Sequence, residues 1–173
     1  MAQHFVKSLP SLCSVLAAAA ILAPAHGYAD TGHGGPFLGL SGQWSGTGTI
    51  TMADGSTLRL RCKSTNAVKA NGKAIQQSLR CADDRFGLDI TSNVASAGGM
   101  LSGTWAEKSH GMWGNISGRA SGSAILAGVA GTGFAASMSV RTKGDREAVA
   151  MRSFTLRPRQ GTDIASVSVA LHK

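Results

Sequence analysis

Residues 58–81, LRLRCKSTNAVKANGKAIQQSLRC, contain a β-hairpin whose register follows from the residues themselves. Asn71-Gly72 is a strong signal for a two-residue type I′ turn, because both central positions of that turn need positive φ. A turn at these two residues places Cys62 opposite Cys81 on the paired strands. We predict a disulfide between them, across a hydrogen-bonded pair whose Cα atoms lie about 5.5 Å apart.

The same register divides the hairpin into two faces, because successive side chains of a strand point to opposite sides of the sheet. One face carries both cysteines and the apolar residues Leu58, Leu60, Val68, Ile75 and Leu79. The other face, which we call the basic face, collects the cations Arg59, Arg61, Lys63, Lys69 and Arg80. The sequence therefore predicts a disulfide-linked hairpin with an apolar inner side and a basic outer side.

Residues 1–29 predict a secretory signal peptide. A short polar start containing Lys7 is followed by an apolar run over residues 9–22, and small residues suit cleavage after either Ala25 or Ala29. The run is shorter than the ~20 residues that a membrane-spanning helix needs, and no later segment approaches that length. Cleavage leaves one pair of cysteines in the mature chain, which predicts a disulfide and a periplasmic or extracellular location.

The mature chain predicts an all-β fold. Its apolar residues alternate in short runs separated by glycine-containing breaks roughly 8–15 residues apart, and no segment keeps the spacing of a core-facing helix. We expect a flexible lead-in over residues 30–40 and a single domain over residues 41–173, with about ten strands joined by short connections. An antiparallel up-and-down meander of this length closes into a barrel, because closure removes the unpaired edges.

Two turn lengths compete after the first strand, at Asp54-Gly55. A two-residue turn would leave Ile50 on the basic side of the sheet. A three-residue loop, with Gly55 in the left-handed conformation, instead places Ile50 opposite Leu58. We favour the longer loop because it buries the apolar side chains together, and it makes Trp44 an inward-facing core residue.

Two later strands are placed by the same reasoning. A turn centred on Ala97-Gly98 would pair Ile90 with Trp105, which makes Trp105 a second core tryptophan. On the strand that follows, Met112 and Ile116 are expected to face inward. Alternating apolar residues up to the C-terminus supply the remaining strands of the barrel.

Gly42-Gln43-Trp44, at the start of an up-and-down meander, resembles the opening of calycin-like barrels such as lipocalins, fatty-acid-binding proteins and avidin-like proteins. Residues 101–105, LSGTW, are similar to avidin-like strands. The resemblance implies that Trp44 packs at a closed barrel end and that the lumen holds a ligand. The avidin-type biotin residues and a second lipocalin motif with its arginine are not found. The chain also resembles periplasmic barrel inhibitors of bacterial metalloproteases, and uncharacterised exported bacterial proteins in general.

The sequence predicts no catalytic residue, metal site or cofactor. Residues 131–136, GTGFAA, match a dinucleotide-binding pattern, but Phe134 begins an alternating strand where that pattern needs a helix. His33, His110 and His172 are scattered, without a carboxylate at ligand spacing. No nucleophile motif is found, and both mature cysteines are assigned to a disulfide. We therefore expect a protein that is not an enzyme.

Charge is the clearest surface signal. The chain has a formal net charge of +8, and Lys63 lies opposite Arg80 on the basic face, where like charges repel. Such a face suits an anionic partner, or it serves only to solvate the hairpin. One function that follows is a barrel that holds a small apolar ligand or docks on an anionic surface.

The alternative function is a protein-binding module, such as a periplasmic protease inhibitor. Its contacts would be the extended segment over residues 30–40 and the basic face. An internal volume above roughly a few hundred Å³ would favour the ligand-binding barrel, and a filled barrel would favour the protein-binding module.

Overall fold

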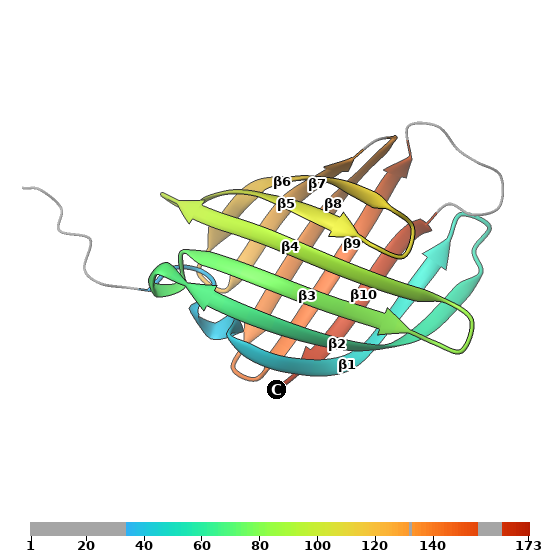
Figure 1. Ribbon diagram of the computed structural model, residues 1–173, viewed down its shortest axis with the longest axis horizontal. Helices are drawn as coiled ribbons and strands as arrows, with labels where there is room; N and C mark the ends of the chain where they lie inside the picture. Colours follow the sequence, from blue (N-terminus) through green and yellow to red (C-terminus); the bar gives the residue numbers. More distant parts are fainter. Residues whose placement is uncertain (1–33, 132, 156–163) are drawn as a thin grey trace, which may run out of the picture. The chain divides into compact units, whose positions relative to one another are not determined.

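The computed structural model describes residues 34–131, 133–155 and 164–173, and the predicted signal peptide at residues 1–29 lies outside them. The described residues form ten antiparallel strands that close into a barrel (Figure 1). Each strand pairs with its neighbours in the sequence, and the first strand closes the barrel by pairing with the last. The all-β up-and-down barrel predicted from the sequence is confirmed.

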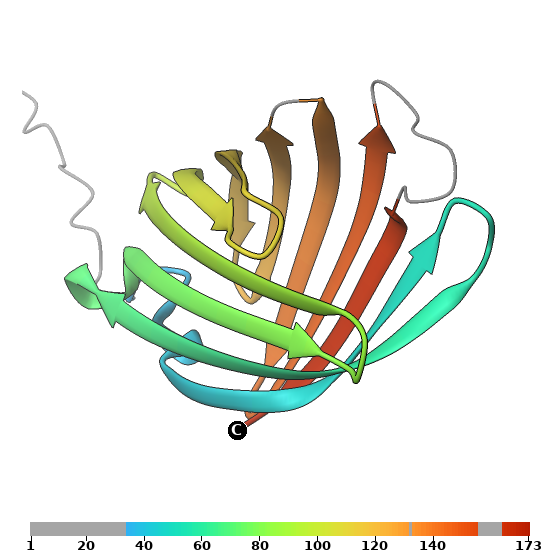
Figure 2. The same ribbon diagram turned by 45° about the vertical axis from the view of Figure 1, so that its right-hand side comes forward.

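The strands curve around a common interior that contains the apolar core (Figure 2). Two short 3₁₀ turns accompany them, η1 (Leu38–Leu40) before the first strand and η2 (Ala70–Gly72) between the second and third. The strands are β1 (Gly42–Met52), β2 (Thr57–Lys69), β3 (Ala74–Ala82), β4 (Gly87–Ala97), β5 (Met100–Glu107), β6 (Met112–Ser121), β7 (Ala124–Gly131), β8 (Phe134–Lys143), β9 (Arg146–Thr155) and β10 (Ile164–His172).

The β2–β3 hairpin has the predicted register, in which Cys62 pairs with Cys81 and forms a disulfide with it. Their Cα atoms are 4.1 Å apart, close to the spacing of a non-hydrogen-bonded pair and not the value of about 5.5 Å that we predicted. The loop explains the difference. The last ladder pair is Lys69 with Ala74, so the loop spans residues 70–73, and three of its residues have positive φ. Hydrogen-bonded and non-hydrogen-bonded pairs alternate along antiparallel strands, counted from the pair that closes the loop. Two additional loop residues move this closing pair by one position while the same residues stay opposite each other. Cys62 and Cys81 therefore form a non-hydrogen-bonded pair.

The β1–β2 hairpin has the longer of the two loops considered. Ile50 pairs with Leu58, and Gly55 has a φ of 84°. Trp44 pairs with Ser64 and is 2% exposed. The longer loop therefore buries Ile50 and Trp44 on the same side of the sheet, as the hydrophobic pattern required.

The predicted β4–β5 turn needs correction. The turn is formed by Gly98-Gly99, both with positive φ, and is not centred on Ala97-Gly98. Ile90 therefore faces Glu107 instead of Trp105. Two consecutive glycines provide the positive φ values that a type I′ turn needs at both central positions. The register shifts by two residues, which keeps every side chain on its predicted face and leaves Trp105 buried.

The residues before β1 close one end of the barrel, which we call the closed end. We expected residues 30–40 to be a flexible lead-in, but Phe37 and Leu40 are buried in the core. The carbonyl oxygen of Leu40 accepts hydrogen bonds from Trp44 Nε1 at 2.9 Å and from Asn66 Nδ2 at 3.0 Å. These bonds satisfy two buried donors and hold η1 across the barrel end, which explains why the segment is ordered.

The last residue of the chain completes the closed end. Lys173 places its ammonium group 4.9 Å from the centroid of the Trp44 ring and donates a hydrogen bond to the carbonyl oxygen of Gly39 at 3.2 Å. The cation–π contact and the hydrogen bond connect the C-terminus to η1. A basic residue thus covers the Trp44 ring.

Glu147 is a buried carboxylate that points into the barrel from β9. It pairs with Leu171 of β10 and is 4% exposed. Its Oε2 atom has no hydrogen-bond partner among the described residues. Burial raises the pKa of this carboxyl above its ordinary value of 4.5. The folded barrel therefore favours the protonated form of Glu147.

Glu147→Gln should change how the stability of the barrel depends on pH. In the wild type, the stability associated with the protonated carboxyl is complete below pH 4.5 and is lost as the pH rises through the raised folded-state pKa. Glutamine does not ionise, so thermal unfolding from about pH 4 to pH 8 should show the wild type losing stability relative to the variant. A constant difference between the two proteins across this range would contradict the proposed burial of an unpaired carboxyl.

Candidate ligand-binding site at the barrel mouth

The barrel end that carries the β1–β2, β3–β4, β5–β6 and β7–β8 connections lies opposite the closed end, and we call it the mouth. A cavity of about 180 Å³ opens there, beside the start of β6 and the end of β7. The residues that line it are three aromatic residues, a methionine and two glycines, namely Trp105, Trp113, Phe134, Met112, Gly111 and Gly131. This composition suits an apolar ligand.

Trp105 and Phe134 form the inner wall of the cavity. The Trp105 Nε1 atom donates a hydrogen bond to the carbonyl oxygen of Ala130 at 3.2 Å, and the two ring centroids lie 5.9 Å apart in an edge-on arrangement. Gly131 leaves room for the indole, because a Cβ atom at this position would approach Trp105 Cζ2 to 3.1 Å. Gly131 ends β7 and Phe134 begins β8, so the dinucleotide-like pattern leads into a strand, as predicted, and not into a helix.

Met112 and Trp113 form the outer edge of the cavity, where they are 40% and 70% exposed. Met112 pairs with the buried Glu107 and lies on the same side of β6 as Ile116, as predicted, but it is the first residue of β6 and is therefore partly exposed at the rim of the barrel. Trp113 received no role in the sequence analysis. Two large exposed apolar side chains beside a cavity are typical of a contact site for an apolar partner or ligand.

Glu107 fixes the β5–β6 turn at the edge of the cavity and is 2% exposed. Its Oε1 atom accepts hydrogen bonds from the backbone N–H groups of Asp89 at 2.8 Å and Ser109 at 3.0 Å. Its Oε2 atom accepts a hydrogen bond from the backbone N–H of His110 at 2.6 Å and lies 2.8 Å from His110 Nδ1. One carboxylate therefore joins the turn to β4 and determines where β6 begins.

The hydrogen bonds that Glu107 accepts favour its charged form. Burial raises the pKa of this carboxyl, but the donors on Asp89, His110 and Ser109 outweigh burial and hold the pKa below its ordinary value. The His110 ring also lies against the Phe86 ring, with 5.6 Å between the centroids. The sequence analysis gave Glu107 no role. The signal for a buried carboxylate was the strand alternation, which places Glu107 on the same side as Trp105.

Glu107→Gln should destabilise the barrel by about 1–3 kcal/mol at neutral pH, because an amide replaces a charged acceptor of several hydrogen bonds. The stability that Glu107 contributes is present above pH 4.5 and is lost as the pH falls through the lowered folded-state pKa. Urea unfolding at neutral pH should therefore give opposite signs for the two buried glutamates, a loss for Glu107→Gln and a gain for Glu147→Gln. The same sign for both variants would contradict this assignment.

The five cations of the basic face lie exposed on the outer wall of β2 and β3. Lys63 pairs with Arg80, so two cations stand opposite each other. Arg80 Nε lies 3.9 Å from Asp89 Oδ2, and Lys69 Nζ donates a hydrogen bond to Gln76 Oε1 at 3.2 Å. An exposed ion pair contributes little in water, so this wall keeps a strongly positive potential.

The His, Cys, Asp and Glu side chains of the described residues are too scattered to hold a metal ion. Within the ranges given above, no three His, Cys, Asp or Glu side chains come together as a metal site, and His33 lies outside those ranges. His110 contacts Glu107, and His172 ends β10. No helix in the described part of the chain is long and apolar enough to cross a membrane.

No protein-family model matches the sequence, and no curated protein matches it. The fold is similar to that of Rv2717c from M. tuberculosis, with a TM-score of 0.60 and 14% identity, over 78% of this chain and 92% of that one. It is also similar to the S-type phycobiliprotein lyase CPES from Guillardia theta, with a TM-score of 0.56 and 8% identity, over 78% and 88%. A DUF3598-family protein of unknown function from Nostoc punctiforme gives a TM-score of 0.52 and 12% identity, over 78% and 47%.

These similarities concern the fold. The ten-stranded closed barrel of this chain is similar in fold to these three proteins. The resemblance first noted at Gly42-Gln43-Trp44 is therefore supported at the level of the barrel. At identities of 8–14%, the similarity does not carry an activity or a ligand from those proteins to this one.

Proposed function

We propose that the protein is an exported, non-enzymatic binding protein that holds a small apolar ligand at the mouth of its barrel. The observation that carries this proposal is the cavity between Trp105 and Phe134, with Met112 and Trp113 exposed at its edge. Aromatic rings and a methionine around a concave space bind apolar groups well, because they offer large contact areas and adapt in shape.

Two inward-facing methionines favour a lumen that a ligand can enter. Met138 and Met151 pair with each other on β8 and β9, face inward, and are partly exposed. Inward-facing side chains in a closed wall contact water mainly through the lumen. Their exposure therefore favours an incompletely filled barrel over a solid one.

The size of the cavity limits the ligand. Sites for drug-sized ligands occupy about 300–1,000 Å³, whereas the cavity at the mouth occupies about 180 Å³. A single ring system or a short alkyl chain suits this volume. A longer ligand would leave part of its surface against Met112 and Trp113 at the rim.

Two further observations bear on the proposal. The Cys62–Cys81 disulfide supports export, because disulfides persist in oxidising compartments.

The alternative of a protease inhibitor used residues 30–40 as a free contact segment. Phe37 and Leu40 in this segment are buried against the barrel, which disfavours that alternative.

Met112→Ala should weaken the binding of a small neutral apolar probe, 1-aminonaphthalene, about 3–10-fold, because each buried CH₂ group contributes about 0.8 kcal/mol. Met100→Ala is the matched control, since Met100 is 54% exposed but lies outside the cavity. Fluorescence titration of the mature protein measures both affinities. Non-saturable binding by the wild type, or the same loss in both variants, would contradict a ligand site at the mouth.

The basic face favours a second candidate function, docking on an anionic membrane surface. Its five side chains are exposed on one wall, where Lys63 and Arg80 stand opposite each other and one carboxylate, that of Asp89, lies 3.9 Å from Arg80. Each such cation near an anionic membrane contributes about 1 kcal/mol. This contribution weakens as salt rises, because charges are screened beyond about 10 Å at 0.1 M salt.

Arg61→Glu/Lys63→Glu should abolish the low-salt binding of the protein to anionic vesicles, because it reverses two charges at the centre of the basic face. Co-sedimentation with phosphatidylglycerol and phosphatidylcholine vesicles across a salt series is the measurement. We expect the wild type to pellet with anionic vesicles at low salt and to be released as salt rises. Equal, salt-insensitive pelleting of both proteins, or no pelleting of the wild type, would refute this function.

A further inference from the structure

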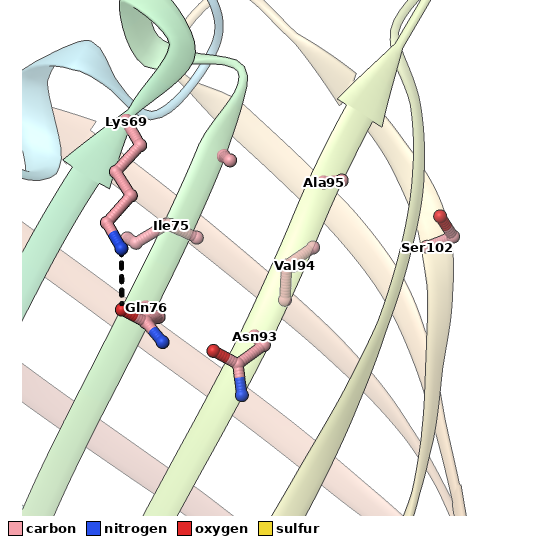
Figure 3. A pocket seen from close by; sticks show the side chains of 8 residues that line it. Lys69, Ile75, Gln76, Asn93, Val94, Ala95 and Ser102 are labelled. Carbon is pink, nitrogen blue, oxygen red and sulfur yellow. Dashed lines mark hydrogen bonds between the residues drawn. The ribbon is translucent and has the colours of Figure 1, made fainter.

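A second hollow lies on the outer wall of the barrel, at the end of the basic face (Figure 3). Its volume is about 240 Å³. Ala74 on β3 and Ala95 on β4 pair with each other and form its floor. Lys69 on β2 pairs with the first alanine, and Ser102 on β5 pairs with the second. The wall is hollow here because two small residues stand side by side between longer ones.

The polar side chains around this hollow can all donate hydrogen bonds. Gln76 and Asn93 form the neighbouring cross-strand pair, and Figure 3 shows them beside Lys69 on three adjacent strands. Lys69 Nζ donates to Gln76 Oε1 at 3.2 Å, which leaves the amide N–H groups of Gln76 for another acceptor. None of the residues that line the hollow is acidic. An anion with several acceptor oxygens therefore suits it best.

The position of the hollow favours a surface that carries many anions, over a single soluble anion, as its binding partner. Lys69 is the last cation of a row that begins at Arg59 on the same strand. At the rise of a β-strand, the row from Arg59 to Lys69 spans roughly 33 Å. One small anion contacts only part of such a row, whereas a layer of lipid headgroups presents anions to several of its cations at once.

We propose that the hollow beside Lys69 binds the phosphate group of an anionic lipid headgroup and gives the docked protein a fixed point of attachment. This inference rests on the docking function proposed for the basic face. Lys69 provides the charge, and Gln76, Asn93 and Ser102 provide hydrogen bonds. These short-range contacts persist at salt concentrations that screen the more distant cations.

Ala95→Leu tests the hollow without changing any charge. Ala95 is exposed, so a leucine fills the hollow from the solvent side, and Ala150→Leu makes the same change at an exposed position of β9. The assay is co-sedimentation with phosphatidylglycerol vesicles at about 0.15 M salt, where screening is strong. We expect binding to fall about fivefold or more in Ala95→Leu and to stay at the wild-type level in Ala150→Leu.

Asn93→Asp is a second variant, which places a carboxylate in the hollow with almost no change in volume. It should lose vesicle binding as Ala95→Leu does, while its circular dichroism and Tm stay those of the wild type. Wild-type binding by both variants would overturn the headgroup site, even where Arg61→Glu/Lys63→Glu still shows that the basic face docks. Complete competition by soluble glycerol phosphate would also overturn it and would assign the hollow to a free phosphate ligand. Equal binding of the wild type to phosphatidylcholine vesicles would refute both the docking function and the headgroup site.

Discussion

Because the ten strands close into one barrel wall, each of their side chains faces either the lumen or the solvent. The apolar core, the disulfide and both buried glutamates occupy the lumen side, and the basic face occupies the solvent side. The distance of a residue from either barrel end then decides its role, so Trp44 seals one end and Trp105 lines the cavity at the other. The mouth cavity is built from β5 to β8 and the basic face from β2 and β3. The proposed ligand site and the proposed docking surface therefore lie on separate strands.

The parts of the fold that the sequence predicted correctly depend on local turn chemistry. Asn71-Gly72 and Gly55 each define a register because few residues tolerate positive φ, and the hydrophobic pattern rejects a shift of one residue. The β4–β5 turn was misplaced because a shift of two residues changes no face. The hydrophobic pattern is the same for both registers there, and only the positive φ of both Gly98 and Gly99 distinguishes them.

The candidate site was harder to predict because its contacts connect distant parts of the chain. Trp105 bonds to Ala130 across 25 residues, and Glu107 bonds to Asp89 across 18. Lys173 reaches Gly39 across 134 residues. Such contacts depend on which strands become neighbours and on where each strand ends at the rim. The alternation of apolar and polar residues along a strand predicts neither of these. The basic face needed only the alternation within one hairpin, so its residues could be grouped from the sequence.

The pairing of β1 with β10, which we call the seam, closes the barrel, so folding depends on the last of the ten strands. It pairs residues 45–52 with residues 164–172, so almost the whole domain must be gathered before the seam forms. Closing so long a loop costs entropy early and slows folding, whereas a hairpin closes a short loop. The β2–β3 hairpin is such a local unit, with its two cysteines 19 residues apart. A chain that emerges from its N-terminus can therefore pair and oxidise this hairpin while the barrel is still an open sheet, and the wall closes only after β10 is available to pair with β1.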